Sequence, residues 1–364
     1  MGRETPHRWQ AAAADMKILI VSQMYPGPDD PDLGAFVAEI GRELSRRGHS
    51  VEVAAVDRRG GSRLKHLRLV ADSLRSAARV PPDVVYAHFL FPAGAAAALA
   101  AALRGTPLVL TAHGRDVRNI GAIPGLRTAT RLAVRRADAV IAVSEYLRSQ
   151  LEQRLGGVPR RTTVINSGVD LDRFHGSSQD EARAELGWDA EGPRFLFVGS
   201  LDERKNVRRL VEAFERLERG SLVLVGDGPL RSEVEGRPGV RVIGRIPHAR
   251  VPRWLAACDV LCLPSLVEPF GQALLEAMAC ERSVLATRVG GPPEFVPDAA
   301  GVLVDPTSVE AIEGGLRRAA ALPSPNPEAR AAASEHGLPR QVDRILEVLE
   351  GAASSRAGPP ASAQ

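Results

Sequence analysis

The chain has 364 residues and a mass of 38.9 kDa, which is enough for about two domains. With 44% hydrophobic and 25% charged residues, its composition excludes collagen-like, mucin-like and wholly disordered proteins. The 47 Lys and Arg against 44 Asp and Glu give a net charge of only +3, and aromatic residues at 4% form no basic and aromatic stacking pattern, so nucleic acid is not expected as a partner.

The two ends of the chain differ in composition from the rest. Residues 1–15 lack the apolar run of a secretory signal, so we expect a flexible leader there. Residues 351–364 are rich in Gly, Ala, Ser and Pro and predict a disordered tail. Residues 87–103 form the most membrane-like stretch, but it is mostly alanine and shorter than the roughly 20 apolar residues that a bilayer requires. Three cysteines are too few for a disulfide framework, which favours the reducing cytoplasm.

Short runs rich in β-branched residues alternate with longer amphipathic segments, which is typical of parallel strands joined by helices. The first unit has predicted strands at 17–21, 51–56, 84–86, 108–111, 139–143 and 163–165. The pattern then restarts, with predicted strands at 195–198, 222–225, 240–243, 260–263, 284–286 and 301–304. Predicted helices between them include 35–47, 146–155, 207–217, 272–279 and 309–321. The fold class is therefore α/β, with two doubly wound parallel sheets.

A turn-rich string at 166–170 separates the two units. The expected organisation is a first domain at 16–170, a second domain at 171–340 and a terminal helix at 341–350. Residues 16–173 hold 23 basic and 15 acidic residues, or +8, whereas residues 174–364 hold 22 and 27, or −5. The basic half indicates a solvated face or, as the alternative, contact with an anionic membrane surface or a phosphate-bearing acceptor.

Polar residues follow several predicted strands of the first unit, where the carboxyl ends of parallel strands line a crevice. His113 and Asp116 come directly after the strand at 108–111. His113 could bind a sugar hydroxyl or move a proton, and it could equally be a satisfied core histidine. The further candidates at this edge are His88, Ser144 and Asn166.

In the second unit, Arg204 and Lys205 stand at a predicted helix start, where cations are unfavourable unless an anion binds. This local conflict indicates a phosphate site. Gly226 and Asp227 follow the strand at 222–225 and allow a tight turn with close backbone approach, although a plain turn explains them equally well.

The segment 264–279 is the most informative one and is read as a strand end, a loop and a helix. The backbone N–H groups of Phe270, Gly271 and Gln272, with the positive helix end, can face a phosphate. Glu276 could then bind the hydroxyls of a ribose and Glu268 those of a sugar. Two surface glutamates flanking a loop are the alternative that spacing alone leaves open.

Other signatures are missing or weak. The sequence contains no G-x-G-x-x-G after a strand, no P-loop, no H-E-x-x-H and no G-x-S-x-G. The acidic strings at 30–32 and 170–172 could hold a divalent ion, but about one such string is expected by chance among this many aspartates. We therefore expect no metal and no cofactor.

Taken together, these motifs resemble the retaining glycosyltransferases of family four, the glycosyl transferases group 1. The segment from Glu268 to Glu276 is similar to the family's E-x7-E motif. The other matching segments, in the family's order, are 113–116, 166–170, 204–205, 225–228 and 290–294. The resemblance covers about residues 16–349 and implies the GT-B fold. In that fold two Rossmann-like domains face each other, the first binding the acceptor and the second the nucleotide sugar, and the terminal helix crosses back to the first domain.

The resemblance also implies a role for each residue of the matching motifs. Glu276 would bind the ribose and Glu268 the donor sugar, while Arg204 and Lys205 would neutralise the diphosphate and His113 would contact the transferred sugar. Further donor-binding residues on the same basis are Gly34 in a loop over the phosphates, Gly226, Asp227, and Arg245 and Ile246 beside the base. Two departures are Ser200, where many members have an arginine, and Ala35, where many have a second glycine.

The implied function is transfer of a hexose from a UDP- or GDP-sugar to an acceptor hydroxyl, with retention and without a metal. We expect a glycan, lipid-linked or small-molecule acceptor, in cell-surface polysaccharide or glycolipid biosynthesis. The expected location is cytoplasmic, with the basic half as a possible peripheral contact on the inner face of the membrane. The alternatives are a nucleotide-sugar epimerase or phosphorylase of the same fold and a non-catalytic nucleotide-sugar-binding subunit.

Overall fold

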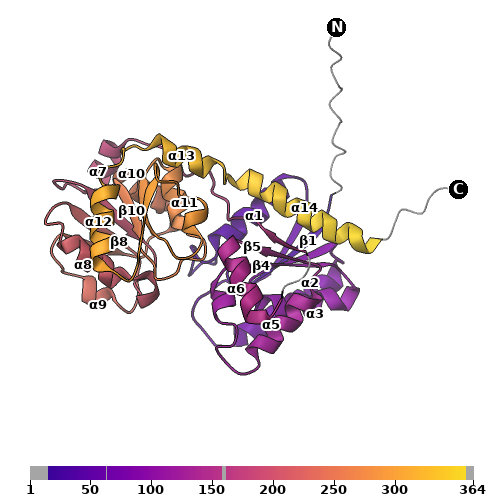
Figure 1. Ribbon diagram of the computed structural model, residues 1–364. Helices are drawn as coiled ribbons and strands as arrows, with labels where there is room; N and C mark the ends of the chain where they lie inside the picture. The colour runs from indigo at the N-terminus through magenta and orange to yellow at the C-terminus, as the bar shows by residue number, and fades with distance from the viewer. Residues whose placement is uncertain (1–14, 63, 158–160, 358–364) are drawn as a thin grey trace, which may run out of the picture.

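The computed structural model describes residues 15–62, 64–157 and 161–357 of the chain. Most of the expected leader (1–14) and the last part of the expected tail (358–364) lie outside the described residues. Two α/β domains lie side by side, and the long terminal helix runs from the second domain along the first (Figure 1).

The first domain is built on a six-stranded parallel sheet with the order β2-β1-β3-β4-β5-β6. Its strands are β1 (Lys17–Ser22), β2 (Ser50–Ala55), β3 (Val84–His88), β4 (Leu108–Ala112), β5 (Ala139–Ala142) and β6 (Thr162–Val164). Its helices are α1 (Ala35–Arg46), α2 (Leu64–Arg79), α3 (Ala93–Arg104), α4 (Arg115–Arg118), α5 (Leu126–Arg136) and α6 (Glu145–Leu155).

Alternating side chains of these strands enter two apolar clusters, because successive residues of a strand point to opposite faces. Ile18 and Ile20 pack with α1 and α14 on one face, whereas Leu19 and Val21 pack with α2, α3, α5 and α6 on the other. Both faces of the sheet are therefore covered, as the near-continuous hydrophobic strands require.

The second domain repeats this architecture, with the strand order β12-β11-β10-β7-β8-β9. Its strands are β7 (Arg194–Val198), β8 (Ser221–Val225), β9 (Val240–Gly244), β10 (Val260–Leu263), β11 (Ser283–Thr287) and β12 (Gly301–Val304). Its helices are α7 (Gln179–Leu186), α8 (Val207–Glu215), α9 (Arg231–Val234), α10 (Val251–Ala257), α11 (Gln272–Ala279), α12 (Val309–Ala319) and α13 (Pro327–Ser334), with short 3₁₀ turns η1 (Glu203–Lys205), η2 (His248–Arg250) and η3 (Pro292–Glu294). Each of the twelve predicted strands forms, so the predicted α/β class with two parallel sheets is confirmed.

The chain passes between the domains twice, and the two crossings are hydrogen-bonded to each other. The backbone N–H of Val169 donates to the carbonyl of His336 at 3.0 Å, and the N–H of Leu338 donates to the carbonyl of Val169 at 2.8 Å. The first crossing lies in the turn-rich string that the sequence predicted as a linker, and the second leads into α14 (Leu338–Ala357).

Helix α14 is longer than predicted at both ends. It begins at Leu338 rather than 341, and residues 351–357, which were expected to belong to a disordered tail, form its last turns. Ala352 is only 2% exposed in the apolar cluster of the first domain, and alanine has the strongest helix propensity. The Ala-rich composition therefore indicated helix here rather than disorder. None of the helices in the described ranges combines the length and hydropathy of a membrane span.

Candidate functional site

The candidate site lies where the carboxyl ends of the two sheets meet. Ser144, which caps the N-terminus of α6, donates its hydroxyl to the carbonyl of Pro269 in the other domain at 2.6 Å. The carboxylate of Glu294 accepts from the backbone N–H groups of Glu145 and Tyr146, each at 2.9 Å. These contacts bring the start of α6 against the loop that precedes α11 and against η3.

Lys205 and Glu268, predicted to act together on the donor, form a close ion pair. The Nζ of Lys205 donates to Oε2 of Glu268 at 2.6 Å, and the Ser265 hydroxyl donates to the same oxygen at 2.9 Å. Glu268 is 7% exposed. Its backbone carbonyl accepts from Gly291, and a Cβ added to Gly290 would lie 1.9 Å from that carbonyl oxygen, so only glycine fits there.

Glu276, the predicted ribose ligand, is 4% exposed and has a histidine partner that the sequence analysis missed. Nε2 of His248 lies 3.2 Å from Oε1 of Glu276. Arg173 contacts Nδ1 of His248 at 2.7 Å and Oε1 of Glu39 at 2.8 Å. A polar chain therefore runs from α1 of the first domain, through the interdomain crossing, to the predicted ribose site.

Two members of this polar chain have shifted pKa values. Burial opposes the charged form of His248, but the carboxylates of Glu276 and Glu39 outweigh it and raise the pKa of the imidazole. Burial raises the pKa of Glu39, although His248 and Arg173 act in the opposite direction. His248 directly follows the predicted base-framing segment that contains Arg245 and Ile246, which was the one signal that could have identified it.

His113 and His88 lie together at the ends of β4 and β3. Nδ1 of His88 is 3.1 Å from Nε2 of His113, and Phe36 and Phe89 flank the His113 ring with centroids at 4.9 and 4.6 Å. Burial lowers the pKa of His113 to about 3 and that of His88 well below its usual value, so both rings are neutral. His88 is fully buried, so it supports His113 rather than reaching an acceptor directly.

Asp116 has a structural role, which differs from its predicted place among the acceptor contacts. Its carboxylate accepts from the backbone N–H groups of Gly114 at 2.8 Å, Leu90 at 2.9 Å and His113 at 3.2 Å. Burial raises the pKa of Asp116, and the hydrogen bonds, which lower it, only partly offset this effect. The carboxylate therefore holds the loop that presents His113. Asn166 has a comparable role, donating to the carbonyl of Val143 at 3.0 Å.

Several of the remaining predicted donor residues have structural contacts of their own. Phe270 is buried and stacks on Phe295, so its side chain belongs to the core, and Gln272 donates across the hinge to the carbonyl of Gly168 at 3.0 Å. Gly271 has φ 109 and caps α11. The backbone N–H of Gly226 donates to the carbonyl of Gly244 at 2.8 Å, and the Asp227 carboxylate accepts from the N–H of Gly228 at 2.8 Å.

The loop that contains Gly34 lies at the end of β1. Gly34 has φ 64, and a Cβ there would lie 2.4 Å from the carbonyl oxygen of Met24, so glycine is required for this turn. Asp30 and Asp32, considered above as metal ligands, both bind the guanidinium of Arg59 at 2.6 Å. Arg59 chiefly, and Arg245 of the other domain to a lesser degree, lower the pKa of Asp30.

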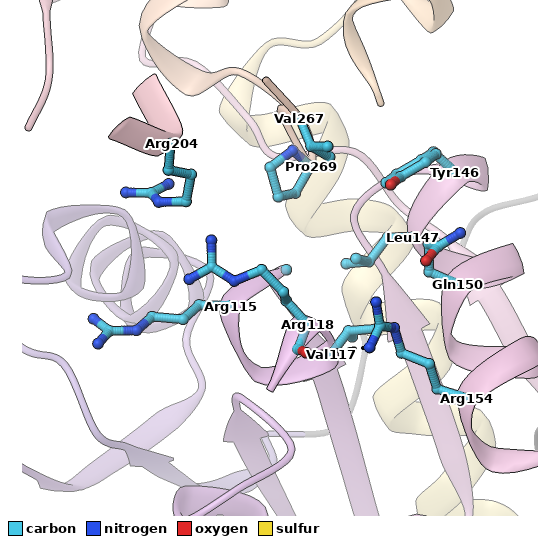
Figure 2. Close-up of a pocket in the computed structure, with 11 residues that line it drawn as sticks. Arg115, Val117, Arg118, Tyr146, Leu147, Gln150, Arg154, Arg204, Val267 and Pro269 are labelled. Atoms are coloured by element: carbon cyan, nitrogen blue, oxygen red, sulfur yellow. Dashed lines mark hydrogen bonds between the residues drawn. The ribbon is translucent and has the colours of Figure 1, made fainter. Parts of the chain in front are cut away.

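A cavity of about 210 Å³ opens between the domains, lined by α4, α6, Arg204 and the loop that precedes α11 (Figure 2). Arg204 reaches it from the second domain, whereas Lys205 turns to Glu268. The guanidinium of Arg204 donates to Asp202 at 3.1 Å and to the hydroxyl of Ser200 at 3.3 Å. Arg204 and Lys205, the two predicted phosphate-binding cations, therefore point in different directions.

Both domains match known glycosyltransferase families. Residues 33–173 match Glycosyltransferase Family 4 and residues 178–337 match Glycosyl transferases group 1. The chain is 34% identical over 241 residues to a Bacillus subtilis protein whose name places it in teichuronic acid biosynthesis, covering 65% of this chain and 61% of that protein. It is also 34% identical over 266 residues to alpha-maltose-1-phosphate synthase of Mycolicibacterium smegmatis, covering 65% of this chain and 68% of that enzyme. A further relative, an uncharacterized glycosyltransferase from Methanocaldococcus jannaschii, is 31% identical and is matched over 59% of its own length.

Solved structures with the same fold include sucrose-phosphate synthase from Thermosynechococcus elongatus, with a TM-score of 0.76 and 20% identity over 93% of this chain and all of that one. Anabaena HepE in complex with UDP-glucose has a TM-score of 0.71 and 24% identity, over 92% of this chain and all of that one. The fold is therefore the GT-B fold that the motifs implied. The chain belongs to the glycosyl transferases group 1 family.

Proposed function

We propose that this protein is a glycosyltransferase that transfers a hexose from a UDP- or GDP-sugar to an acceptor hydroxyl, with retention and without a metal ion. The observation that supports it best is the pair of buried carboxylates, Glu268 and Glu276, held eight residues apart at the start of α11 with Lys205 against the first. Anabaena HepE, which shares the fold, has been solved with UDP and with UDP-glucose.

Each carboxylate has a polar partner that a donor would replace. Ribose hydroxyls are hydrogen-bond donors, so they can take the place of His248 on Glu276, and sugar hydroxyls can likewise share Glu268 with Lys205. A buried carboxylate that lacks a hydrogen-bond donor lowers the stability of the protein, so this exchange favours a ligand that is rich in hydroxyl groups. Lys205 and Arg204 then face the diphosphate.

In the proposed transfer, the bond between the anomeric carbon and the diphosphate oxygen breaks and a bond to the acceptor oxygen forms on the same face. The acceptor proton passes to the departing phosphate, and no enzyme nucleophile takes part. Lys205 and Arg204 stabilise the charge that develops on that phosphate. His113, held by His88 and by the loop that Asp116 fixes, contacts the transferred sugar.

The first test is thermal stability of the full chain with UDP-, GDP- and other nucleotide sugars in the presence of EDTA. A ligand at 100 times its dissociation constant stabilises a protein by about 2.7 kcal/mol. We expect one nucleotide class to raise Tm, Glu276→Ala to abolish the shift, and Glu347→Ala, an exposed site on α14, to retain it. If no nucleotide sugar raises Tm of the wild type, the donor assignment is wrong.

Product analysis separates the alternatives. A transferase leaves the donor intact until an acceptor is added and then gives a product with the donor's anomeric configuration, readable by NMR. Release of free sugar, or isomerisation of the donor, without an acceptor indicates the phosphorylase or epimerase instead. Binding without turnover over a broad acceptor panel indicates the non-catalytic subunit. A rate that falls in EDTA and returns with added metal contradicts the metal-free proposal.

We also propose a peripheral contact between the first domain and an anionic membrane, on the cytoplasmic side, in polysaccharide or glycolipid biosynthesis. Leu99 and Leu103 on α3 and Leu132 on α5 are more than half exposed, and α3 packs beside α5, which also exposes Arg127 and Arg135. Apolar groups with cations are suited to an anionic bilayer. Co-sedimentation with phosphatidylglycerol vesicles but not phosphatidylcholine vesicles, reversed by salt, is expected; equal recovery with both contradicts the proposal.

A further inference from the structure

All the charged residues that line the cavity between the domains are positively charged. The cavity is formed by Gly114, Arg115, Val117, Arg118, Tyr146, Leu147, Gln150, Arg154, Arg204, Val267 and Pro269. Four of these eleven residues are arginines and none is Asp or Glu. Figure 2 shows Arg118 of α4 extending toward Arg204 of the second domain, with Arg115 beside it and Arg154 on the far side.

Within the part of the chain that the structure describes, three of the four guanidinium groups, those of Arg115, Arg118 and Arg154, form no ion pair with an acid. Arg204 has Asp202 as its partner at 3.1 Å, and Arg154 donates to the backbone carbonyl of Arg118 at 3.2 Å. Burial lowers the pKa of Arg118, and the like charges of Arg204 and Arg115 add to the effect. Repulsion of this kind costs free energy that a bound anion removes.

The remaining lining residues indicate what is attached to the anion. Tyr146 offers a ring and Gln150 an amide, while Val117, Leu147 and Pro269 form an apolar wall. The volume of about 210 Å³ is below the range of about 300–1,000 Å³ typical of drug-sized ligands, so it fits one small group rather than an oligosaccharide. Arg115 also lines a second cavity of about 520 Å³ with Arg58 and Lys65, into which a longer acceptor can extend.

The cavity lies next to the predicted reacting centre. Gly114 follows His113 and Arg204 precedes Lys205 in the chain, so each side of the lining is one residue from a predicted catalytic group. Arg204 lines the cavity, whereas Lys205 pairs with Glu268. A group bound by Arg115, Arg118 and Arg154 would therefore lie on the first-domain side of Arg204, next to the loop that carries His113.

We propose that the first-domain arginines of this cavity, Arg115, Arg118 and Arg154, bind an anionic group of the acceptor while Arg204 faces the donor diphosphate, so that the acceptor is a phosphate- or carboxylate-bearing sugar rather than a neutral one. Planar guanidinium groups bind phosphate and carboxylate through paired hydrogen bonds. This proposal rests on the proposed transferase function and adds the class of acceptor to it. Soluble sugar phosphates and lipid-linked phosphates both carry an anionic group that such a site can bind.

The test uses the full chain saturated with UDP, so that the donor site is occupied, and measures binding calorimetrically. The probes are glucose, glucose 6-phosphate and geranyl phosphate in micelles. We expect at least one phosphate-bearing probe to bind ten times or more tightly than glucose. Preference for glucose 6-phosphate indicates a soluble acceptor, and preference for geranyl phosphate a lipid-linked one. If neither binds more tightly than glucose, the proposal is overturned.

Substitutions distinguish this site from the donor site. Arg118→Gln and Arg115→Gln change exposed side chains, so the fold is preserved. Each should weaken the phosphate-bearing probe about tenfold or more, the effect of one charge-assisted hydrogen bond, while UDP binding stays unchanged. Arg79→Gln, an exposed arginine at the end of α2, is the matched control and should leave both affinities unchanged.

Two further outcomes are decisive. If Arg118→Gln weakens UDP as much as the phosphate-bearing probe, the arginines serve the donor and the acceptor proposal is wrong. If neither UDP nor GDP binds the wild type but glucose 6-phosphate still binds in an Arg118-dependent way, the anion site stands and the proposed donor is wrong.

Discussion

At the scale of single residues, the two donor carboxylates are held ready by partners that differ in chemistry. Glu268 is paired with an ammonium group at 2.6 Å, whereas Glu276 contacts an imidazole at 3.2 Å. The pKa of this imidazole is raised above its usual value, chiefly because burial of the ring is outweighed by the carboxylates of Glu276 and Glu39. The two halves of the donor site therefore respond differently to substitution and to pH.

Lys205→Ala is expected to destabilise the protein by about 3 kcal/mol, because it leaves Glu268 as a buried carboxylate without its cation. The double variant Lys205→Ala, Glu268→Ala should be less destabilised than the sum of the single variants, since both charges are then removed. Urea unfolding of the four proteins gives the coupling. Strictly additive free energies of unfolding would show that the pair does not interact.

His248 should make stability depend on pH. Its pKa is raised in the folded state above the usual 6.5, so the folded state favours the protonated ring. The stability that it adds is present below that usual value and is lost as pH rises through the raised pKa. The difference in free energy of unfolding between the wild type and His248→Gln should therefore shrink as pH rises, and nucleotide affinity should increase as Glu276 is released. A difference that grows with pH would contradict this assignment.

At the level of residues, the sequence could predict positions where the residues lie within one loop, while their roles stay predictions. Lys205 stands at a helix start, and Glu268 and Glu276 lie on either side of another, so their placement at strand ends followed from the α/β pattern. Arg173 contacts residues 134 and 75 positions away, Glu39 and His248, and no local pattern encodes such a contact. The arginines of the cavity come from both domains, and only their folded arrangement shows one cavity of a single charge sign.

At the scale of secondary structure, the strands were predictable because buried parallel strands are continuous apolar runs of a length that helices do not share. The end of α14 could not be predicted, because a composition of Ala, Gly and Ser is found both in disordered tails and in helices whose small residues pack closely. Whether such a segment forms a helix depends on the surface of the first domain, against which Ala352 and Leu349 pack.

Leu349→Ala tests how much α14 contributes. The side chain is fully buried in the cluster that α14 shares with α1 and β1, so its loss should cost about 2–5 kcal/mol. Glu347→Ala changes an exposed residue of the same helix and should cost less than about 0.5 kcal/mol. Thermal or urea unfolding gives both values. Equal effects would mean that α14 does not pack on the first domain as described.

At the scale of the whole molecule, the domains meet through few polar contacts beside two chain crossings, which favours hinge motion. Glu294 of the second domain accepts from two backbone N–H groups at the start of α6 in the first. Charge-assisted bonds to a helix N-terminus are favourable, so this glutamate stabilises the arrangement in which the domains touch.

Glu294→Ala should therefore increase the population of more open molecules and enlarge the radius of gyration measured by small-angle X-ray scattering. Asp298→Ala, which changes an exposed carboxylate of the same domain, is the matched control. Bound donor should reduce the difference, because it adds contacts across the cleft. Identical scattering from both variants would show that Glu294 does not hold the domains together.

The packing of α14 against the first domain also bears on how the protein is made. The ribosome synthesises the first domain before the second, yet the face of its sheet formed by Ile18, Val84 and Tyr86 is completed only by α14, which follows the second domain in the chain. During translation α14 therefore cannot cover this apolar face until the whole second domain has been synthesised. Nascent chains released before α14 should consequently be recognised by chaperones at the first domain, although every strand of both sheets is already present.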